Sequence, residues 1–179
     1  MKPSIIAAAL VGIALVSLSS ESRAQVSTVA KPVQFGIAAG AALPMSDLSD
    51  NFNTGFNVTG TVGFSPALIP LGVRVDAAYN SFGAKGAGSN LNFTSVTGNL
   101  VYKFPSTGVS PYAIGGAGWY HAASSGSTSE DHFGWNLGGG ISMPLSGFDT
   151  FLEARYNQVQ FGNGAPSAKF IPITFGVMF

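Results

Sequence analysis

Apolar and polar residues alternate along most of the chain, which is the pattern of β-strands that present one apolar face. The clearest case is 55–64, where Phe56, Val58, Val62 and Phe64 alternate with polar or small residues. Turn-rich segments separate the alternating stretches. The pattern predicts eight strands, at 34–42, 55–64, 72–82, 93–104, 111–121, 132–142, 149–159 and 169–179.

The connections between these strands alternate in length. Those after the second, fourth and sixth strands are short, and the others are longer and rich in Ser, Asn, Asp and Gly. Short turns at one end and long loops at the other, with an even strand count, are typical of transmembrane barrels. We therefore predict an all-β fold, an eight-stranded antiparallel up-and-down transmembrane β-barrel over 34–179, with long outer loops at 43–54, 83–92, 122–131 and 160–168.

Aromatic residues collect near the predicted strand ends, where their rings suit a membrane interface. We expect two aromatic belts. The inner belt consists of Phe64, Phe104, Tyr112 and Phe179. The outer belt consists of Tyr79, Tyr120, Phe133, Trp135 and Tyr156.

The last strand ends the chain on an aromatic residue. Its outward face is apolar at every second position, at Ile171, Ile173, Phe175, Val177 and Phe179. This ending resembles the C-terminal strand of bacterial outer-membrane barrels, and residues 34–179 as a whole resemble the small OmpA/OmpX-type family. The resemblance implies an outer-membrane location and recognition of these five residues by the barrel-assembly machinery.

The start of the chain has the features of a secretory signal peptide. Lys2 supplies a positive charge, 5–18 is apolar, and Ser22 and Ala24 are small residues before a cleavage point. We predict a signal peptide at 1–24 and a periplasmic lead at 25–33. A membrane-anchoring helix is less favoured because the apolar run is shorter than the ~20 residues that a span needs.

Composition agrees with a lipid-exposed barrel. Only 9% of the residues are charged, against about 25% in ordinary soluble domains. The formal net charge of +0 argues against a nucleic-acid partner, and the absence of cysteine excludes disulfides. The main alternative is a soluble, secreted, lipocalin-like ligand-binding barrel, which would place the apolar stripes inside.

Two predicted strands carry charges on their polar faces, Arg74 with Asp76 and Glu153 with Arg155. In an eight-stranded barrel all four would point into a narrow lumen, where charges need partners. We predict an interior charge network that acts as a static plug, with Lys103, nearer the periplasmic end, as a candidate extra member; a conductance gate is the alternative. Glycines at 115–116, 118 and 138–140 would leave room for bulky neighbours such as Arg155.

One long loop carries the candidate chemistry. His121 and His132 flank it beside Glu130 and Asp131, so a metal site or pH switch would be conceivable if the two imidazoles met. Some barrels of this kind are lipid-modifying enzymes, for which the only comparable set would be His121, Ser124, Ser125, Glu130 and His132. Nothing in the loop holds a nucleophile against its base. We expect no enzyme activity, no catalytic residue, no cofactor and no metal.

The predicted function is that of a structural outer-membrane protein that displays four extracellular loops. Adhesion or another surface interaction, or minor small-solute permeation, would follow from such a scaffold. We expect a monomer surrounded by outer-membrane lipid, with an extracellular ligand that the sequence does not identify. The lumen of eight strands is too narrow for a general porin.

Overall fold

The computed structural model describes residues 33–66, 69–124, 129–162 and 165–179. The predicted signal peptide at 1–24 lies outside the described residues, and so does the predicted lead except for its last residue. Among the described residues, no helix is long and apolar enough to cross a membrane.

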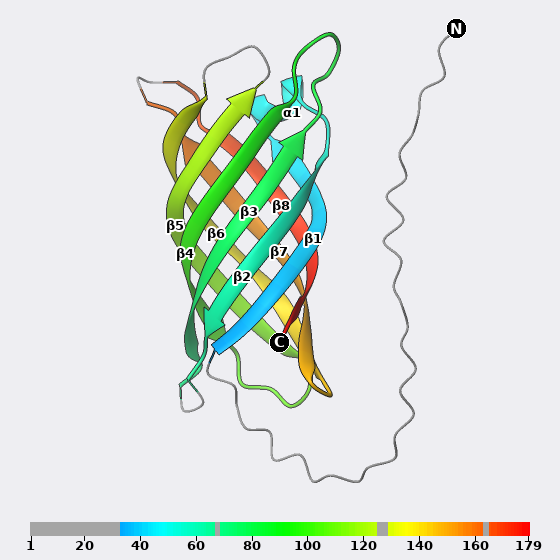
Figure 1. Ribbon diagram of the computed structural model, residues 1–179, viewed down its shortest axis with the longest axis vertical. Coiled ribbons are helices and arrows are strands. Elements are labelled where there is room, and N and C mark those ends of the chain that lie inside the picture. Colours follow the sequence, from blue (N-terminus) through cyan, green and yellow to red (C-terminus); the bar gives the residue numbers. More distant parts are fainter. Residues whose placement is uncertain (1–32, 67–68, 125–128, 163–164) are drawn as a thin grey trace, which may run out of the picture.

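Eight antiparallel strands form a closed barrel, as predicted (Figure 1). Each strand pairs with the next, and β1 pairs with β8. In the described part of the chain the elements are β1 (Val33–Met45), α1 (Asp47–Asn51), β2 (Gly55–Phe64), β3 (Leu71–Phe82), β4 (Leu91–Lys103), β5 (Ser110–Ser124), β6 (Glu130–Leu145), β7 (Phe148–Gln160) and β8 (Ala168–Met178).

The barrel has two distinct ends. The start of β1, the end of β8 and the short connections lie at one end, which we call the inner end (Figure 1). Helix α1 and the longer connections lie at the other, the outer end. This arrangement follows from the alternation of connection lengths in the sequence.

The seam between β1 and β8 closes the sheet over nearly its whole length. Paired residues run from Gly36 with Met178 to Met45 with Lys169. Phe179 extends the seam, because its N–H donates to Phe35 O at 2.7 Å and its carbonyl accepts from Phe35 N at 3.2 Å. The closed sheet has no open edge, which a strand at hydrocarbon depth requires.

Around the middle of the barrel, apolar side chains point outward and polar ones inward. Val75, Leu152 and Phe175 have exposed fractions of 54%, 45% and 54%, whereas Arg74 and Glu153 next to them in sequence are buried. Because the apolar stripes lie on the outside, the soluble lipocalin-like alternative is wrong.

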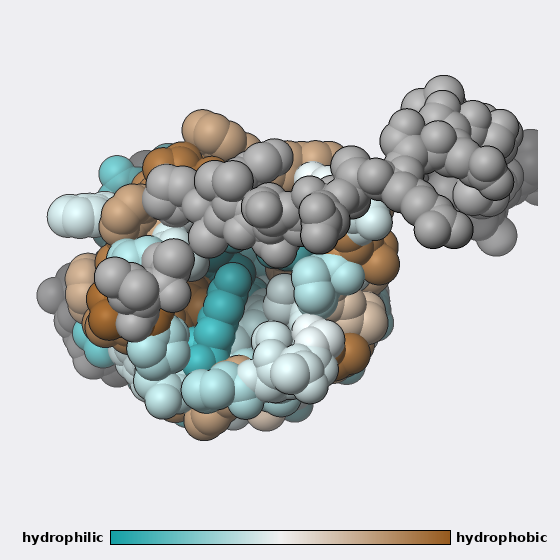
Figure 2. Space-filling view, turned by 90° about the horizontal axis from the view of Figure 1, so that it is seen from below, coloured by the Kyte–Doolittle hydropathy of each residue, from teal (hydrophilic) through white to brown (hydrophobic). Residues whose placement is uncertain are grey.

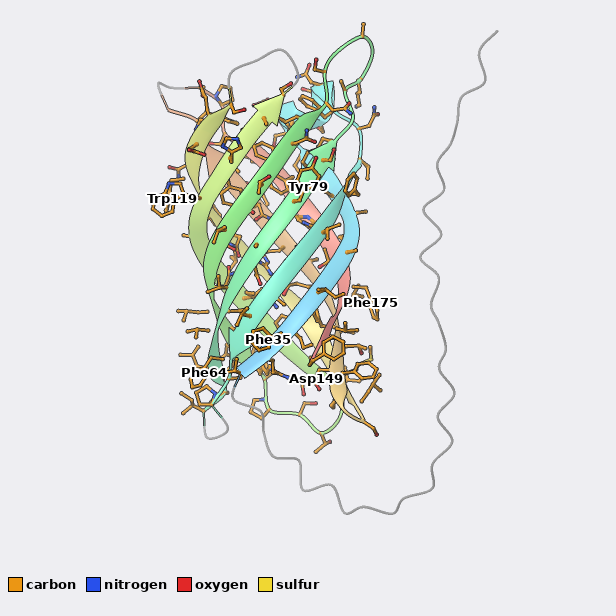
Figure 3. The ribbon with its side chains drawn as sticks, viewed as in Figure 1. Phe35, Phe64, Tyr79, Trp119, Asp149 and Phe175 are labelled. Carbon is orange, nitrogen blue, oxygen red and sulfur yellow. The ribbon has the colours of Figure 1, made fainter. Side chains whose placement is uncertain are left out.

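The outer wall carries aromatic residues near both ends (Figure 3). Trp119 and Tyr79 lie in the outer half, and Phe35 and Phe64 lie near the inner end. Phe148 and Phe179 pack together beside the inner end of the seam, with ring centroids 6.1 Å apart. These positions suit the two interfaces of a bilayer.

Several strands extend beyond the predicted ends, so the loops are shorter than expected. The pairing of β5 with β6 continues to Ala122 with Glu130, inside the expected loop. The expected loop at 43–54 contains the end of β1 and helix α1. The helix forms because Leu48 is buried against the outer mouth of the barrel, a tertiary contact that local turn chemistry does not reveal.

Candidate functional site

The centre of the lumen holds four charged side chains, which we call the charge square: Arg74 and Asp76 of β3, and Glu153 and Arg155 of β7. Across the lumen, Arg74 Nη2 lies 2.7 Å from Glu153 Oε2, and Arg155 Nη1 lies 2.8 Å from Asp76 Oδ2. Along the strands, Arg74 pairs with Asp76 at 3.0 Å and Arg155 pairs with Glu153. The structure thus brings the four predicted residues together.

The order of charges on the two strands explains this geometry. Strands β3 and β7 are four places apart in the closed barrel and run in the same direction. The sequence order is Arg74 then Asp76 on one strand, and Glu153 then Arg155 on the other. Each charge therefore has one opposite charge on its own strand and another across the lumen, the arrangement that buried charges need.

Polar side chains add hydrogen bonds to the square. Asn99 Nδ2 donates to Asp76 Oδ2 at 3.0 Å, and Asn136 Nδ2 donates to Asn99 Oδ1 at 2.9 Å. A buried charge is tolerated when such hydrogen bonds satisfy its remaining lone pairs. Strands β4 and β6 are in this way connected to the charges of β3.

Two tyrosines also point into the lumen, which corrects the prediction that they belong to the interfacial belts. Tyr112 Oη donates to Glu153 Oε2 at 2.8 Å, and Tyr120 Oη donates to Asn157 Oδ1 at 2.8 Å. Both are buried because even-numbered residues of β5 face inward. The glycine-rich stretch hid this alternation in the sequence.

Lys103 does not join the charge square. It lines a separate cavity nearer the inner end, together with Gln34 and Asp149. Among the residues that the structure describes, its ammonium forms no ion pair. Lys103 thus lies nearer the inner end, as expected, but it is not a member of the network.

Above the square, toward the outer end, the lumen is filled by an apolar cluster that we call the outer-end plug. Its aromatic centre is Phe82, Phe93 and Phe170, whose ring centroids lie 5.4 to 6.3 Å apart. Leu48 of α1 and Tyr120 belong to the same cluster. The alternation of the strands did not reveal this cluster, although all three phenylalanines lie at inward positions of their strands.

Inward-facing glycines accommodate the large lumen side chains. A Cβ at Gly140 would come within 2.6 Å of the Tyr112 hydroxyl, and one at Gly134 within 2.6 Å of the Tyr120 ring. At Gly138 it would meet the β7 backbone, including Arg155 Cα at 2.7 Å. Gly134 and Gly140 thus make room for the tyrosines, whereas Gly138 meets the backbone of β7 and not the Arg155 side chain that we expected.

The two histidines of the β5–β6 hairpin face opposite sides of the wall. His121 Nδ1 lies 2.8 Å from Asp131 on the outside, whereas the His132 side chain is largely buried and packs edge-on against Phe161. His132 Nε2 is 3.4 Å from Glu130 Oε2. The two imidazoles therefore do not meet, and no group of three metal-ligating side chains occurs among the described residues.

Little open space remains around the square. The cavity beside it, lined by Thr61, Asp76, Thr97 and Thr174 among others, has a volume of about 30 Å³, and a single water needs roughly 10–15 Å³. The Thr61 hydroxyl oxygen is buried there without a protein partner among the described residues. A few waters fit this space, and the outer-end plug lies above it.

Comparison with protein families gives one match that covers nearly the whole chain. The family described as "Outer membrane protein beta-barrel domain" matches residues 5–179. A search of curated proteins found no match.

Several solved structures share this fold. Neisserial surface protein A aligns with a TM-score of 0.70 and 19% identity, covering 82% of this chain and 96% of that one. The outer membrane enzyme PagL aligns at 0.51 with 16% identity, covering 82% and 98%. Ail, the attachment invasion locus protein of Yersinia pestis, aligns at 0.50 with 22% identity, covering 82% and 98%. At these identities the likeness shows the fold alone.

Proposed function

The chain belongs to the outer membrane protein beta-barrel domain family, and from this premise we propose that it is a structural outer-membrane protein: a sealed, monomeric barrel that displays four extracellular loops for surface interaction. The barrel lies in the outer membrane. In the proposed orientation its outer end faces the cell exterior and its inner end faces the periplasm.

The single observation that carries the proposal is the double closure of the lumen. The charge square fills the centre, and the outer-end plug fills the lumen above it. Both are made of side chains from several strands that pack or pair across the axis. A barrel closed in this way is suited to anchoring and display, and unsuited to general solute passage.

The outer end supports a display role because two of its loops are tied together. Phe52 forms a β-bridge with Ala84, and Lys85 N donates to Asn51 O at 2.8 Å. Lys85 Nζ donates to Ser49 O at 2.7 Å. The β1–β2 and β3–β4 loops thus form one connected surface. A surface ordered before binding loses less conformational entropy when a partner docks.

We also propose that the protein is not an enzyme. Of the comparable set, His121 is paired with Asp131 on the outside of the wall and His132 is packed against Phe161. Ser125 lies outside the described residues. Outer-membrane lipids from cells with and without the protein should have the same mass profile; a new lipid species that disappears in His121→Ala or His132→Ala would contradict the proposal.

The apolar face of β8 supports recognition by the barrel-assembly machinery, as the resemblance implies. Phe179→Ala should reduce the amount of folded protein in the outer membrane. Phe35→Ala is the matched control, because both residues are exposed phenylalanines at the same seam but only one is terminal. Equal losses for the two variants would indicate a packing effect instead of a terminal signal.

The closure is tested by conductance in planar bilayers, with a large porin as the positive control. The wild type and Arg155→Ala should both stay near the baseline leak, because the outer-end plug remains intact in each. Arg155→Ala combined with Phe82→Ala, which weakens both closures, should raise the leak. Steady wild-type conductance would reject the sealed barrel, and a leak from Arg155→Ala alone would favour the conductance gate.

Orientation and display are tested with single cysteines, since the chain has none. Ser89→Cys is exposed in the β3–β4 loop, and Thr107→Cys is exposed in the β4–β5 connection at the opposite end. A membrane-impermeant maleimide should label only the first in intact cells and both after lysis. The reverse pattern would overturn the orientation.

Surface interaction is tested by loop replacement. Substituting Gly-Ser linkers for 83–90 should reduce adhesion of cells that display the protein, whereas the same replacement at 104–109 should not. Equal adhesion by cells with the wild type, the loop variant and no protein would remove the interaction role while leaving the barrel scaffold intact.

A further inference from the structure

The wall of the barrel has to pair its own backbone groups. Figure 2, a view onto the inner end, shows hydrophobic residues on the outside of the wall and hydrophilic residues within it. Hydrocarbon offers no hydrogen bonds, so each backbone N–H and C=O of a spanning strand needs a partner in the protein. The pairing of β7 with β8 is nevertheless interrupted at one place.

The interruption, which we call the β7–β8 pairing gap, consists of 155–156 on β7 and 171–172 on β8. The Cα partners are continuous up to Ala154 with Ile173 and resume at Asn157 with Phe170. The register is the same on both sides of the gap. No extra residue is therefore inserted in either strand, and a β-bulge does not explain the interruption.

Pro172 explains the gap, because proline has no backbone N–H to donate. Phe35 and Phe179 exchange both of their backbone hydrogen bonds across the seam between β1 and β8. Since this direction alternates along a strand, odd-numbered residues of β8 direct their N–H groups to β1 and even-numbered ones direct theirs to β7. Pro172 faces Arg155 in this register, so the Arg155 carbonyl lacks a donor from β8.

The Asn157 side chain supplies the missing donor. Its Nδ2 donates to Arg155 O at 3.0 Å, and its Oδ1 accepts a hydrogen bond of 2.8 Å from Tyr120 Oη. Asn157 is buried in the lumen, and both polar atoms of its amide are used. A lumen side chain thus completes the backbone pairing that the wall requires.

The stretch of wall between the gap and the outer mouth is short. Among the described residues, three pairs join the strands there: Asn157 with Phe170, Gln158 with Lys169, and Val159 with Ala168. Each strand also has another neighbour, since β7 pairs with β6 as far as Gln160 and β8 pairs with β1 as far as Lys169. Val159 and Phe170 belong to the outer-end plug. Separation of these three pairs would therefore uncover one side of the plug.

We propose that β7 and β8 open locally from the outer mouth to the pairing gap, and that Asn157 holds this stretch closed. Opening breaks the three outer pairs and exposes the plug to the outside. The pairs on the inner side of the gap stay formed. The charge square joins β3 to β7 and does not use β8, so it stays closed below the opened stretch.

Amide hydrogen exchange, followed by NMR in lipid nanodiscs, tests the local opening. Phe170 and Thr174 both direct their N–H groups to β7, on the outer and the inner side of the gap respectively. The Phe170 amide should exchange faster than the Thr174 amide, because it belongs to the stretch that opens. A Phe170 rate equal to the Thr174 rate would overturn the proposal.

Removal of the Asn157 amide should favour opening. Asn157→Ala should speed exchange at Phe170 about fivefold, the factor that one ordinary hydrogen bond gives, and leave Thr174 unchanged. Asn80→Ala is the matched control, because Asn80 is also buried in the lumen but its side chain accepts from Asn57. It should change neither rate. Equal acceleration at Phe170 and Thr174 in Asn157→Ala would overturn the proposal, because it would indicate global unfolding.

Pro172→Ala restores an N–H group opposite the Arg155 carbonyl. It should slow exchange at Phe170 about fivefold. In the Pro172→Ala background, Asn157→Ala should change the Phe170 rate by less than about twofold, because the two substitutions act on the same carbonyl. An equal effect of Asn157→Ala in both backgrounds would overturn the role of Asn157. If Asn157→Ala does not fold, Pro172→Ala decides alone, and a Phe170 rate unchanged from that of the wild type would overturn the proposal.

Discussion

The charge square and the outer-end plug close the same lumen by different physical means. In the square, four buried charges satisfy one another through directed contacts of defined geometry. In the plug, phenylalanine rings fill space with contacts that have no fixed partner. Loss of one charge leaves others buried and unpaired, whereas loss of some apolar volume is partly relieved by repacking. A single substitution in the square should therefore cause a large loss of unfolding free energy, and one in the plug a smaller loss.

The largest effect is expected at Glu153, which accepts hydrogen bonds from Arg74, Arg155 and Tyr112. Glu153→Ala leaves both guanidinium groups short of an acceptor in the lumen. We expect the free energy of unfolding to fall by about 3–5 kcal/mol. Urea unfolding in lipid vesicles measures it, followed by the fluorescence of the two tryptophans.

The matched control is Asp149→Asn, an acidic residue at the inner rim that lies outside the square. It should change the free energy of unfolding by less than about 0.5 kcal/mol. A double variant, Glu153→Ala with Arg155→Ala, should cost less than the sum of its single variants because the two residues are coupled. If the loss of unfolding free energy in the double variant equals the sum of the losses in the two single variants, the square does not act as a unit.

An intermediate loss of unfolding free energy is expected at Gly140, which lies against the Tyr112 side chain that donates to Glu153. At Gly140→Ala, the new methyl group would lie 2.5 Å from the Leu152 backbone oxygen and 2.6 Å from the Tyr112 hydroxyl. It would press on β7 and displace the hydroxyl from Glu153. We expect a loss of about 1–3 kcal/mol, the usual cost of overpacking. Gly98→Ala is the control, because a Cβ there meets nothing within 4 Å. Similar losses of unfolding free energy at both sites would mean that replacing any strand glycine has this effect, and that the crowding at Tyr112 does not cause it.

A smaller effect is expected in the plug. Phe82→Leu removes part of a fully buried ring that packs against Phe93 and Phe170. Partial repacking should limit the loss of unfolding free energy to about 1 kcal/mol, measured by the same urea unfolding. Phe64→Leu, on the exposed outer wall, should cost less. A loss as large as that of Glu153→Ala would show that the plug is as specific as the square.

The same contrast explains how much the sequence could predict. Strand alternation puts Arg74, Asp76, Glu153 and Arg155 on inward faces, and buried charges require partners, so the square followed from parity and charge alone. The plug did not follow, because a lumen face is expected to be polar. Three inward positions near the outer end are occupied by Phe82, Phe93 and Phe170. No local sequence pattern indicates that the lumen at that end is filled by apolar side chains.

Other differences have the same origin in long-range contacts. Helix α1 depends on the burial of Leu48 in the barrel mouth, and Lys103 lies apart from the square because it is nearer the inner end. The inward positions of Tyr112 and Tyr120 depend on glycines of the neighbouring strand. The sequence shows which residues share a face of a strand, and not how far a side chain reaches across the lumen.

The smallest effect is expected at the rim, where His121 and Asp131 form an ion pair on the outside of the β5–β6 hairpin. Their distance of 2.8 Å matches that of Arg155 and Asp76, but their side chains are 49% and 70% exposed. Water already solvates both groups, so we expect Asp131→Asn to change the free energy of unfolding by less than about 0.5 kcal/mol. Urea unfolding of Asp131→Asn and of Glu153→Ala under the same conditions compares the two losses of unfolding free energy. A loss above about 2 kcal/mol would show that burial does not govern the difference between the two pairs.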